Sequence, residues 1–347
     1  MNLIVNIRKK LRDFYLDVNF KVIDEVFALL GASGCGKSMT LKCIAGIETP
    51  DEGKIILNDR ILFDSDQKIN LSPQDRHVGY LFQNYALFPN MTVAENILFS
   101  AVGDTDEKNL ALKKNLERFK LNGLENSYPS KLSGGQQQRV AFARILASNA
   151  EILLLDEPFS ALDNYLKWQL ELEISSLLKF YDNAAILVSH DRGEAFRLSD
   201  RIAVMNHGLI DTINSKDQLF KNPQTLSTAK ITGCQNISAA HIENDFIIAE
   251  DWKIKLPITN YPLQIKYLAV RANDLEYRTS EGKNIFLMKV DQAIEDINCF
   301  VVMLKHKENH SELKLIRWEV DKKIWRKIQA EEIYLYFPPE KLIFLEN

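Results

Sequence analysis

Four short apolar runs in the first half of the chain define its predicted architecture. They span residues 26–30, 78–82, 152–155 and 185–188, and a glycine-rich or polar stretch follows each of them. Runs of this length are typical of strands buried on both faces, as in a parallel sheet. The patterns of residues 93–100, 107–121, 137–147 and 164–180 predict helices between these strands. We therefore predict an α/β fold for this part of the chain.

Shorter strands are expected before and between these runs. Residues 3–7 and 14–22 predict two strands, and residues 54–60 and 61–63 predict a hairpin. Thr92 is the expected N-cap of the helix 93–100.

Beyond residue 230 the pattern changes to short strands separated by polar turns. The predicted strands are 246–258, 265–271, 285–290, 300–304, 313–318 and 333–337. This pattern is typical of a small all-β domain. A chain of 347 residues exceeds what one core usually holds. We predict two domains, 1–230 and 231–347, with a helical subdomain at about 84–148 in the first.

The stretch after the first apolar run has the composition of a phosphate-binding loop, the Walker A pattern. Its glycines let backbone N–H groups converge where side chains would block them. Lys37 is placed to reach the β- and γ-phosphates of a nucleotide, and Ser38 to bind Mg²⁺ through its hydroxyl. The predicted phosphate-binding residues are Gly31, Ala32, Ser33, Gly34, Cys35, Gly36, Lys37, Ser38 and Met39.

Polar side chains at three other strand ends fit nucleotide hydrolysis. After the run 152–155, Asp156 is predicted to hold Mg²⁺, directly or through water, and Glu157 to polarise the attacking water. Gln83 is expected to contact Mg²⁺ or that water, and His190 to reach the γ-phosphate and orient the water of Glu157. The predicted catalytic residues are Glu157, His190 and Gln83, and the predicted Mg²⁺ ligands are Ser38, Gln83 and Asp156.

A second anion-binding helix start lies at Leu132, Ser133, Gly134, Gly135 and Gln136. A serine and two glycines open the predicted helix 137–147, and the amino end of a helix attracts an anion. The chain's own phosphate loop does not need this second site, so the motif implies a partner chain. Asp163 precedes the helix 164–180. It is expected either to cap that helix or to lie at the interface with the partner chain, and the sequence leaves both roles open.

The adenine ring of a bound nucleotide needs a separate contact, because a phosphate loop binds the phosphates and not the base. Phe14 or Tyr15 lies where an adenine can stack on an aromatic ring. Packing into the core is the alternative for an aromatic residue in a strand.

Composition and charge narrow the function further. A net charge of −4 argues against a dedicated nucleic-acid binder. No apolar run reaches the roughly 20 residues that span a bilayer, and residues 1–5 lack the apolar core of a signal peptide. The four cysteines show no C-x-x-C spacing, which favours reduced thiols. We expect a cytoplasmic protein whose membrane role, if any, comes through another subunit.

Taken in order, the motifs resemble the nucleotide-binding subunit of an ABC transporter over residues 1 to about 230. The order is Walker A, Gln83, Leu-Ser-Gly-Gly-Gln, Leu-Leu-Asp-Glu-Pro, Ser-Ala-Leu-Asp and Ser-His. The resemblance implies an ATPase that uses ATP and Mg²⁺ and works as a head-to-tail homodimer with two ATP molecules between the chains. It implies that Ser133, Gly135 and Gln136 serve the partner's nucleotide, while the other site residues, Asp163 included, serve the chain's own. The segment between Phe14 and the loop is shorter than usual in this family, which leaves the stacking aromatic open.

Other stretches resemble importers that use a separate extracytoplasmic substrate-binding protein. These are residues 71–76 and 82–89, the latter bordering the groove for a coupling helix of the membrane permease. Residues 268–275 and 336–342 resemble an OB-like accessory domain of the TOBE or MOP type. Residues 31–40, 159–167 and 231–238 are most similar to molybdate- or sulfate-type importers. The resemblance implies ATP hydrolysis at the cytoplasmic face of the membrane, coupled to uptake of an oxyanion, molybdate first.

Several alternatives stay open at this point. Importers of sulfate, polyamine, ferric iron or sugar share most of the core motifs. A soluble ABC ATPase of translation or repair usually carries tandem ATPase domains or coiled-coil insertions, and a P-loop kinase leaves residues 132–136 unexplained. The C-terminal domain is expected to support dimerisation or to sense the oxyanion.

Overall fold

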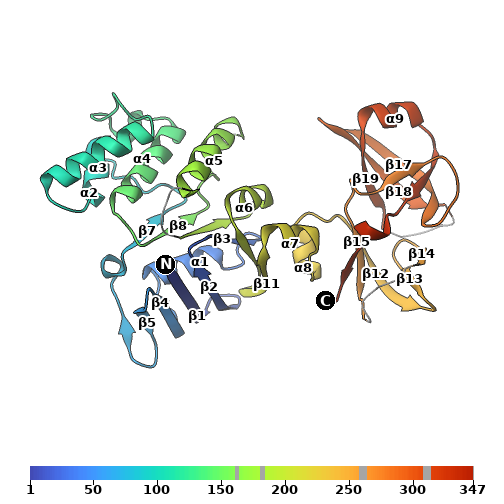
Figure 1. Ribbon diagram of the computed structural model, residues 1–347, viewed down its shortest axis with the longest axis horizontal. Coiled ribbons are helices and arrows are strands. Elements are labelled where there is room, and N and C mark those ends of the chain that lie inside the picture. Colours follow the sequence, from blue (N-terminus) through green and yellow to red (C-terminus); the bar gives the residue numbers. More distant parts are fainter. Residues whose placement is uncertain (161–163, 180–183, 258–263, 308–313, 347) are drawn as a thin grey trace. The chain divides into compact units, whose positions relative to one another are not determined.

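The chain forms two compact units, Met1–Lys216 and Asp217–Asn347. The computed structural model, drawn in Figure 1, describes residues 1–160, 164–179, 184–257, 264–307 and 314–346. The division falls before residue 230, at which the sequence pattern changes. Helix α8 (Leu226–Ile231) therefore belongs to the second unit.

An 11-stranded mixed sheet forms the centre of the first unit, in the order β6-β5-β4-β1-β2-β11-β10-β3-β9-β8-β7. Neighbouring strands are parallel from β10 through β3, β9 and β8 to β7. These strands are β10 (Arg201–Asn206), β3 (Val26–Gly31), β9 (Ala185–Ser189), β8 (Ile152–Asp156) and β7 (Val78–Leu81). Every residue of β8 and β9 is buried, as their unbroken apolar sequences predict.

The other half of the sheet is largely antiparallel. Its strands are β1 (Asn2–Lys10), β2 (Tyr15–Ile23), β4 (Glu52–Leu57), β5 (Arg60–Asp64), β6 (Ile69–Asn70) and β11 (Leu209–Ser215). Alternate residues of β1 and β2 are buried, and their side chains share one core cluster with Leu41 and Ile44 of α1 (Lys37–Ala45). Phe14 was predicted inside a strand, but it precedes β2, because Leu11 N donates to Phe14 O at 2.9 Å and closes a turn there.

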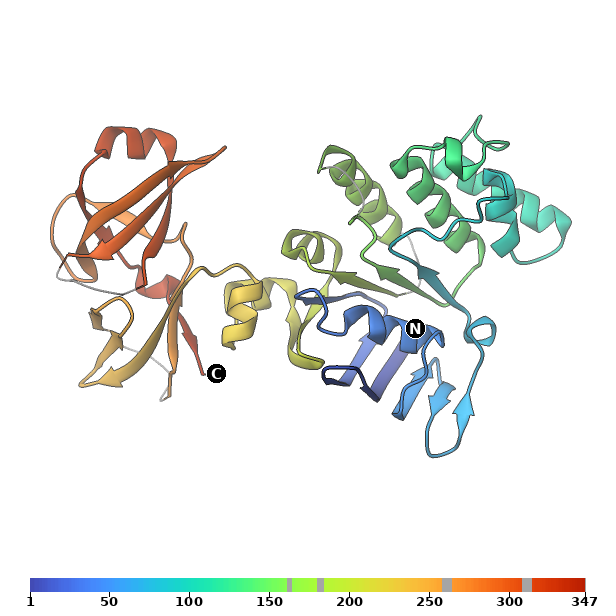
Figure 2. The same cartoon turned by 180° about the vertical axis from the view of Figure 1, so that it is seen from behind.

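Three helices pack against one another beyond the β7 edge of the sheet. They are α2 (Val93–Ser100), α3 (Thr105–Arg118) and α4 (Gly134–Ala147), and Figures 1 and 2 show them gathered on the side away from β1 and β4. Thr92 caps α2, as predicted. Capping boxes at Asp104 and Ser133 start α3 and α4 earlier than the predicted 107 and 137. The remaining elements of this unit are α5 (Asn164–Lys179), α6 (Arg192–Leu198) and the 3₁₀ turns Pro73–Arg76 and Pro129–Lys131.

The second unit contains two five-stranded sheets, in the orders β14-β13-β12-β15-β21 and β16-β20-β17-β18-β19. Helix α7 (Lys216–Lys221) starts at the division, and the 3₁₀ turn Pro339–Lys341 precedes the last strand. The first sheet comprises β12 (Asn236–Glu243), β13 (Phe246–Ala249), β14 (Ile254–Pro257), β15 (Tyr267–Val270) and β21 (Ile343–Leu345). The second comprises β16 (Glu276–Arg278), β17 (Ile285–Glu295), β18 (Cys299–His306), β19 (Ile316–Asp321) and β20 (Glu332–Tyr336). These sheets are consistent with the predicted OB-like domain.

Several elements of the second unit were not predicted, among them β12 and helix α9. No strand was predicted over β12, because its buried residues Asn236, Ser238 and Ala240 are polar or small and form no apolar alternation. Helix α9 (Lys322–Ile328) has only 7 residues, and Trp325 is its one buried side chain, so no helical period is visible in the sequence.

The side chain of Asn236 completes the edge of the second sheet. Its Nδ2 donates to Arg317 O at 2.8 Å, and its Oδ1 accepts from Arg317 N at 2.7 Å. Arg317 lies on the edge strand β19, and the N–H of Glu319 on the same strand donates to Ala272 O at 3.0 Å. Residues of another strand and of a loop thus satisfy the backbone groups of this edge.

None of the helices in the described part of the chain is both long and apolar enough to span a membrane.

Gly53→Ala should lower the free energy of unfolding by about 3 kcal/mol or more, because the new methyl group has no room. Gly53 has φ +106°, and a Cβ there would lie 2.1 Å from Asn6 O, on the neighbouring strand. Gly123→Ala is the matched control: its φ is +85°, but nothing lies within 4 Å of the added carbon. That variant should lose only about 1 kcal/mol, the cost of the left-handed backbone alone. Equal urea midpoints for the two variants would contradict this assignment.

Candidate nucleotide-binding site

The strand order brings the predicted site residues to one edge of the sheet. Strands β3, β9 and β8 are parallel neighbours, and the register pairs Leu30 with Ser189 and Asp156 with Val188. The loop after β3, His190 after β9 and Glu157 after β8 therefore leave the sheet on the same side. Ligands of open α/β sheets bind at this carboxyl edge.

The loop after β3 is shaped as a cradle. Gly34 and Gly36 have φ +81° and +105°, and a Cβ on Gly31 would lie 2.4 Å from Met205 O. Gly36 is the N-cap of α1 and supplies no side chain to its first N–H groups, which are left for an anion. A phosphate group fits this loop because its glycines carry no side chains that would block access to the backbone N–H groups. Cys35 is buried, whereas Ala32 and Ser33 are exposed and Met39 is half-buried in α1.

Lys37 lies inside this cradle. Its Nζ donates to Gly31 O and Ala32 O at 2.9 Å each and lies 3.9 Å from Cys35 Sγ. The lysine is only 3% exposed, so its charge is held within the loop. A bound phosphate would compete with these two carbonyl oxygens for the ammonium group.

Asp156 is hydrogen-bonded through both carboxylate oxygens. Ser38 Oγ donates to Oδ1 at 2.6 Å, and Tyr80 Oη donates to Oδ2 at 2.8 Å. Burial, together with the adjacent Asp156, raises the pKa of Tyr80, so this phenol stays a donor. Tyr80 was not among the predicted site residues. Its only sequence signal is its place on the strand that leads to Gln83.

Ser38 and Asp156 together fit Mg²⁺, which prefers hard oxygen ligands. Within the described residues, no group of three or more His, Cys, Asp or Glu side chains could hold a metal ion. Mg²⁺ beside a nucleotide is commonly held by one or two protein oxygens together with phosphate oxygens, and Ser38 and Asp156 would supply the protein oxygens here.

The three predicted catalytic side chains meet at Glu157. His190 Nδ1 lies 3.3 Å from Glu157 Oε1, and Gln83 Nε2 lies 3.4 Å from Oε2. Glu157 has φ +46°, in the left-handed region, and its N–H donates to Val188 O at 3.1 Å. A non-glycine residue in this conformation costs free energy and is common at functional sites. The carboxylate is thus held between two polar groups that come from neighbouring strand ends.

The second anion-binding motif lies on α4. Ser133 Oγ accepts from Gln136 N at 3.3 Å, and Gln136 Oε1 accepts from Ser133 N at 2.9 Å. A Cβ on Gly135 would lie 2.6 Å from Leu166 Cδ2, while Ser133 and Gly134 are exposed and Leu132 is buried. No hydrogen bond among the described residues joins this motif to the loop after β3. Asp163, the other predicted interface residue, lies outside the described residues.

The two candidate aromatics differ in their surroundings. The Phe14 ring would contact a Cβ on Gly36 at 3.6 Å, so it lies against the phosphate loop, and it is half-buried. Tyr15 is 62% exposed at the start of β2. Phe14 is therefore the aromatic that the structure places beside the loop.

The segment after Gln83 ends in an exposed aromatic pair. The rings of Phe88 and Phe99 lie 4.7 Å apart, and both side chains are exposed. Arg144 of α4 donates to Tyr85 O at 3.0 Å and to Ala86 O at 2.7 Å, and it lies over the Phe88 ring. The sequence did not predict that Arg144 would hold this segment through its backbone carbonyl groups. Tyr85, which lies in the segment 82–89 that the resemblance places at the groove for a coupling helix, is buried.

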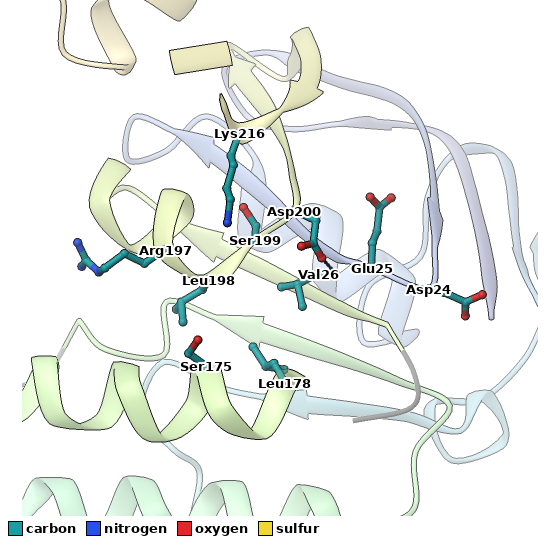
Figure 3. Close-up of a pocket in the computed structure, with 10 residues that line it drawn as sticks. All are labelled: Asp24, Glu25, Val26, Ser175, Leu178, Arg197, Leu198, Ser199, Asp200 and Lys216. Atoms are coloured by element: carbon teal, nitrogen blue, oxygen red, sulfur yellow. Dashed lines mark hydrogen bonds between the residues drawn. The ribbon is translucent and has the colours of Figure 1, made fainter. Parts of the chain in front are cut away.

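A cavity of about 290 Å³ lies at the opposite end of the strands (Figure 3). It is bounded by the start of β3 at Val26, by α5 and α6, and by Asp200 and Lys216. None of the predicted site residues lines it. The predicted donors and carboxylates converge instead at the carboxyl edge of the strands.

Comparison with known proteins identifies the family. A family model described as "ABC transporter" matches residues 15–160. A sulfate/thiosulfate import ATP-binding protein of Mannheimia succiniciproducens is 39% identical over 272 residues, 74% of this chain and 73% of that protein. The protein of the same description from Nitrosomonas europaea is 34% identical over 342 residues, 95% of this chain and 92% of that protein. The chain belongs to the ABC transporter family.

Two further similarities cover a smaller share of the chain. An Fe(3+) ions import ATP-binding protein of Haemophilus influenzae is 44% identical over 222 residues, 62% of each protein. The dimeric structure of the ATP-binding cassette MJ0796 bound to ADP and Pi has a TM-score of 0.53 and 27% identity. It covers 62% of this chain and 99% of that chain. The predicted α/β fold of an ABC ATPase is confirmed.

Phe14→Ala should raise the KM for ATP about tenfold, the usual worth of one aromatic ring stacked on a base. Tyr15→Ala, the matched control, should change it by less than about twofold. Steady-state phosphate release at varied ATP gives both values, and melting temperatures check that each variant is folded. A larger effect at Tyr15 would move the adenine contact to that residue.

Proposed function

We propose that this chain is the ATP-hydrolysing subunit of an ABC importer for an oxyanion. The observation that carries the proposal is the position of Glu157, held between Gln83 and His190 beside the phosphate loop. A fixed carboxylate next to a phosphate cradle is the arrangement that hydrolysis requires.

Each residue of the site has a defined task in this proposal. ATP supplies the phosphoanhydride bond, and Mg²⁺ neutralises charge on its phosphates. Lys37 and the N–H groups of the loop bind the phosphates, while Ser38 and Asp156 hold the metal. Glu157 orients a water and accepts its proton at a carboxylate oxygen.

His190 and Gln83 assist Glu157 in this proposal. Their contacts with Glu157 would orient its carboxylate, and with it the attacking water, toward the phosphates.

A second copy of the chain completes the proposed site. The amino end of α4 carries exposed Ser133 and Gly134, and nothing in the chain's own loop uses them. In a head-to-tail pair, Ser133, Gly135 and Gln136 bind the partner's nucleotide. The similar cassette MJ0796 has been solved as a dimer, which supports this arrangement. Asp163 is assigned to the same interface.

Phe88 and Phe99 form the proposed contact with a membrane permease. An exposed aromatic pair is a favourable docking surface, and here it follows directly on the segment that begins at Gln83. The subunit would act at the cytoplasmic face of the membrane. Its permease would receive substrate from an extracytoplasmic binding protein.

Sulfate is the transported oxyanion best supported by the relatives. The match that extends through the C-terminal unit, over 95% of this chain, is to a protein named for sulfate and thiosulfate. A protein named for ferric iron matches 62% of the chain, and two proteins named for spermidine or putrescine match 61% and 73%. Molybdate, the ion favoured by the sequence, is named by none of these relatives. Ferric iron, polyamine and sugar are the alternatives.

For the C-terminal unit we propose support of the dimer rather than sensing of the oxyanion. An anion site needs several positive groups free to converge on one point. Several basic side chains here are instead paired with carboxylates, as in Lys305 with Asp291, Lys307 with Glu332, and Lys314 with Asp251.

Glu157→Gln should lower ATP hydrolysis at least about 100-fold, because the amide cannot accept the proton of the water. ATP and Mg²⁺ should then hold two copies of the variant together, which size-exclusion chromatography would detect. Glu151→Gln changes a carboxylate at the start of the same strand and should hydrolyse ATP as the parent does. Hydrolysis by Glu157→Gln at the parent rate would refute the assigned role.

The substrate is tested by uptake in a strain that lacks the gene. Radiolabelled sulfate and elemental molybdenum should be measured in parallel at limiting supply, with the intact gene or Lys37→Ala restored. Sulfate uptake that returns only with the intact gene is expected. Loss of molybdenum alone would establish molybdate, and unchanged levels of both would shift the substrate to ferric iron, polyamine or sugar.

A further inference from the structure

Two partly buried ion-pair contacts join α5 to the segment of Asp191 and α6, which follows His190. Lys167 Nζ lies 2.7 Å from Asp191 Oδ2 and 2.6 Å from Glu194 Oε1. One turn further along α5, Glu171 Oε2 lies 2.6 Å from Arg197. Both pairs connect the same helices, but only the first reaches a residue adjacent to His190.

The contacts of Lys167 reach both neighbours of His190. Asp191, which follows it, caps α6 by accepting from Gly193 N and Glu194 N at 2.7 and 3.2 Å. Ser189, which precedes it, donates to Glu194 Oε2 at 2.6 Å and accepts from Asp191 N at 2.9 Å. The backbone on each side of His190 is therefore fixed by one polar cluster, Ser189, Asp191 and Glu194, with Lys167 as its cation.

Lys167 is the counter-charge that this cluster needs. Burial acts to lower the pKa of Lys167, but the hydrogen bonds to Asp191 and Glu194 outweigh it and raise the pKa overall. Glu194 is only 4% exposed. Without the lysine, two carboxylates would face each other in a poorly solvated place, which is costly. They would move apart or take up a proton, and the turn that carries His190 would shift.

We propose that Lys167 is a positioning residue for hydrolysis, which holds His190 against Glu157 through Asp191 and Glu194. This inference rests on the proposed ATPase function of the same site. Because α5 begins at Asn164, next to Asp163, a displacement of α5 by a second copy of the chain would reach His190 through this contact. Lys167 itself touches neither Glu157 nor the phosphate loop through any described hydrogen bond or ion pair.

The distance between His190 Nδ1 and Glu157 Oε1, 3.3 Å, leaves little room for such a shift. His190 is half exposed, so its own packing does not hold it in place. Its position depends on the backbone that carries it. A displacement of about 1 Å in a catalytic group is enough to cost a large factor in rate.

The test compares Lys167→Gln and Lys167→Arg with Glu171→Gln in the full-length protein. Lys167→Gln should lower the kcat for ATP hydrolysis about tenfold and leave the KM within about twofold, because the phosphate loop is untouched. Lys167→Arg keeps the charge and should restore most of the rate. Glu171→Gln removes the other ion pair between the same helices and should leave kcat at the parent value.

A double-mutant cycle with His190→Ala separates positioning from general stabilisation. If Lys167 acts through His190, adding Lys167→Gln to His190→Ala should lower kcat by less than about twofold further. A further tenfold loss in that background, or equal losses from Lys167→Gln and Glu171→Gln, would overturn the inference. Melting temperatures identify any variant that does not fold, and Lys167→Met then replaces Lys167→Gln in the same cycle.

The outcomes distinguish this inference from the proposed function. A parent protein without any ATP hydrolysis would overturn both. An active parent whose rate is unchanged in Lys167→Gln would overturn only the role of the lysine.

Discussion

The parallel pairing of β3, β9 and β8 is the constraint on which the site depends. Its hydrogen bonds fix the heights at which the three strands end, and the residues after those ends carry the chemistry. A slip of two residues would preserve the buried faces of these strands but separate Glu157 from the phosphate loop by about 7 Å. The fully buried apolar sequences of β8 and β9 therefore serve the site as well as the core. They hold the sheet rigid where small displacements are costly.

Much of the fold and of the site was predictable because the relevant signals are local. The phosphate loop, the N-cap Thr92 and the apolar strands each occupy a few consecutive residues, and each has a direct physical reason. Glu157, Gln83 and His190 could be grouped because strand ends in such a sheet share one edge. Phe14 could not be separated from Tyr15, since only the turn closed by Leu11 decides which ring lies against the loop.

The residues that sequence reasoning missed act through contacts between distant segments. Tyr80 reaches Asp156, Arg144 reaches the carbonyl groups of Tyr85 and Ala86, and Lys167 reaches Asp191. Polar side chains of this kind are common on helices and strands, so their types and spacings predict nothing. Helix α9 was missed for a related reason: its few residues depend on the packing of Trp325 against Trp318 rather than on a helical pattern.

The amide of Asn236 has a consequence for the solution behaviour of the protein. By pairing with both backbone groups of Arg317, it occupies positions at which a strand of another molecule would bind. Open sheet edges are the usual starting points of intermolecular β-pairing and aggregation. The side chain of Asn236, together with the carbonyl group of Ala272, therefore protects this edge from intermolecular pairing at high concentration.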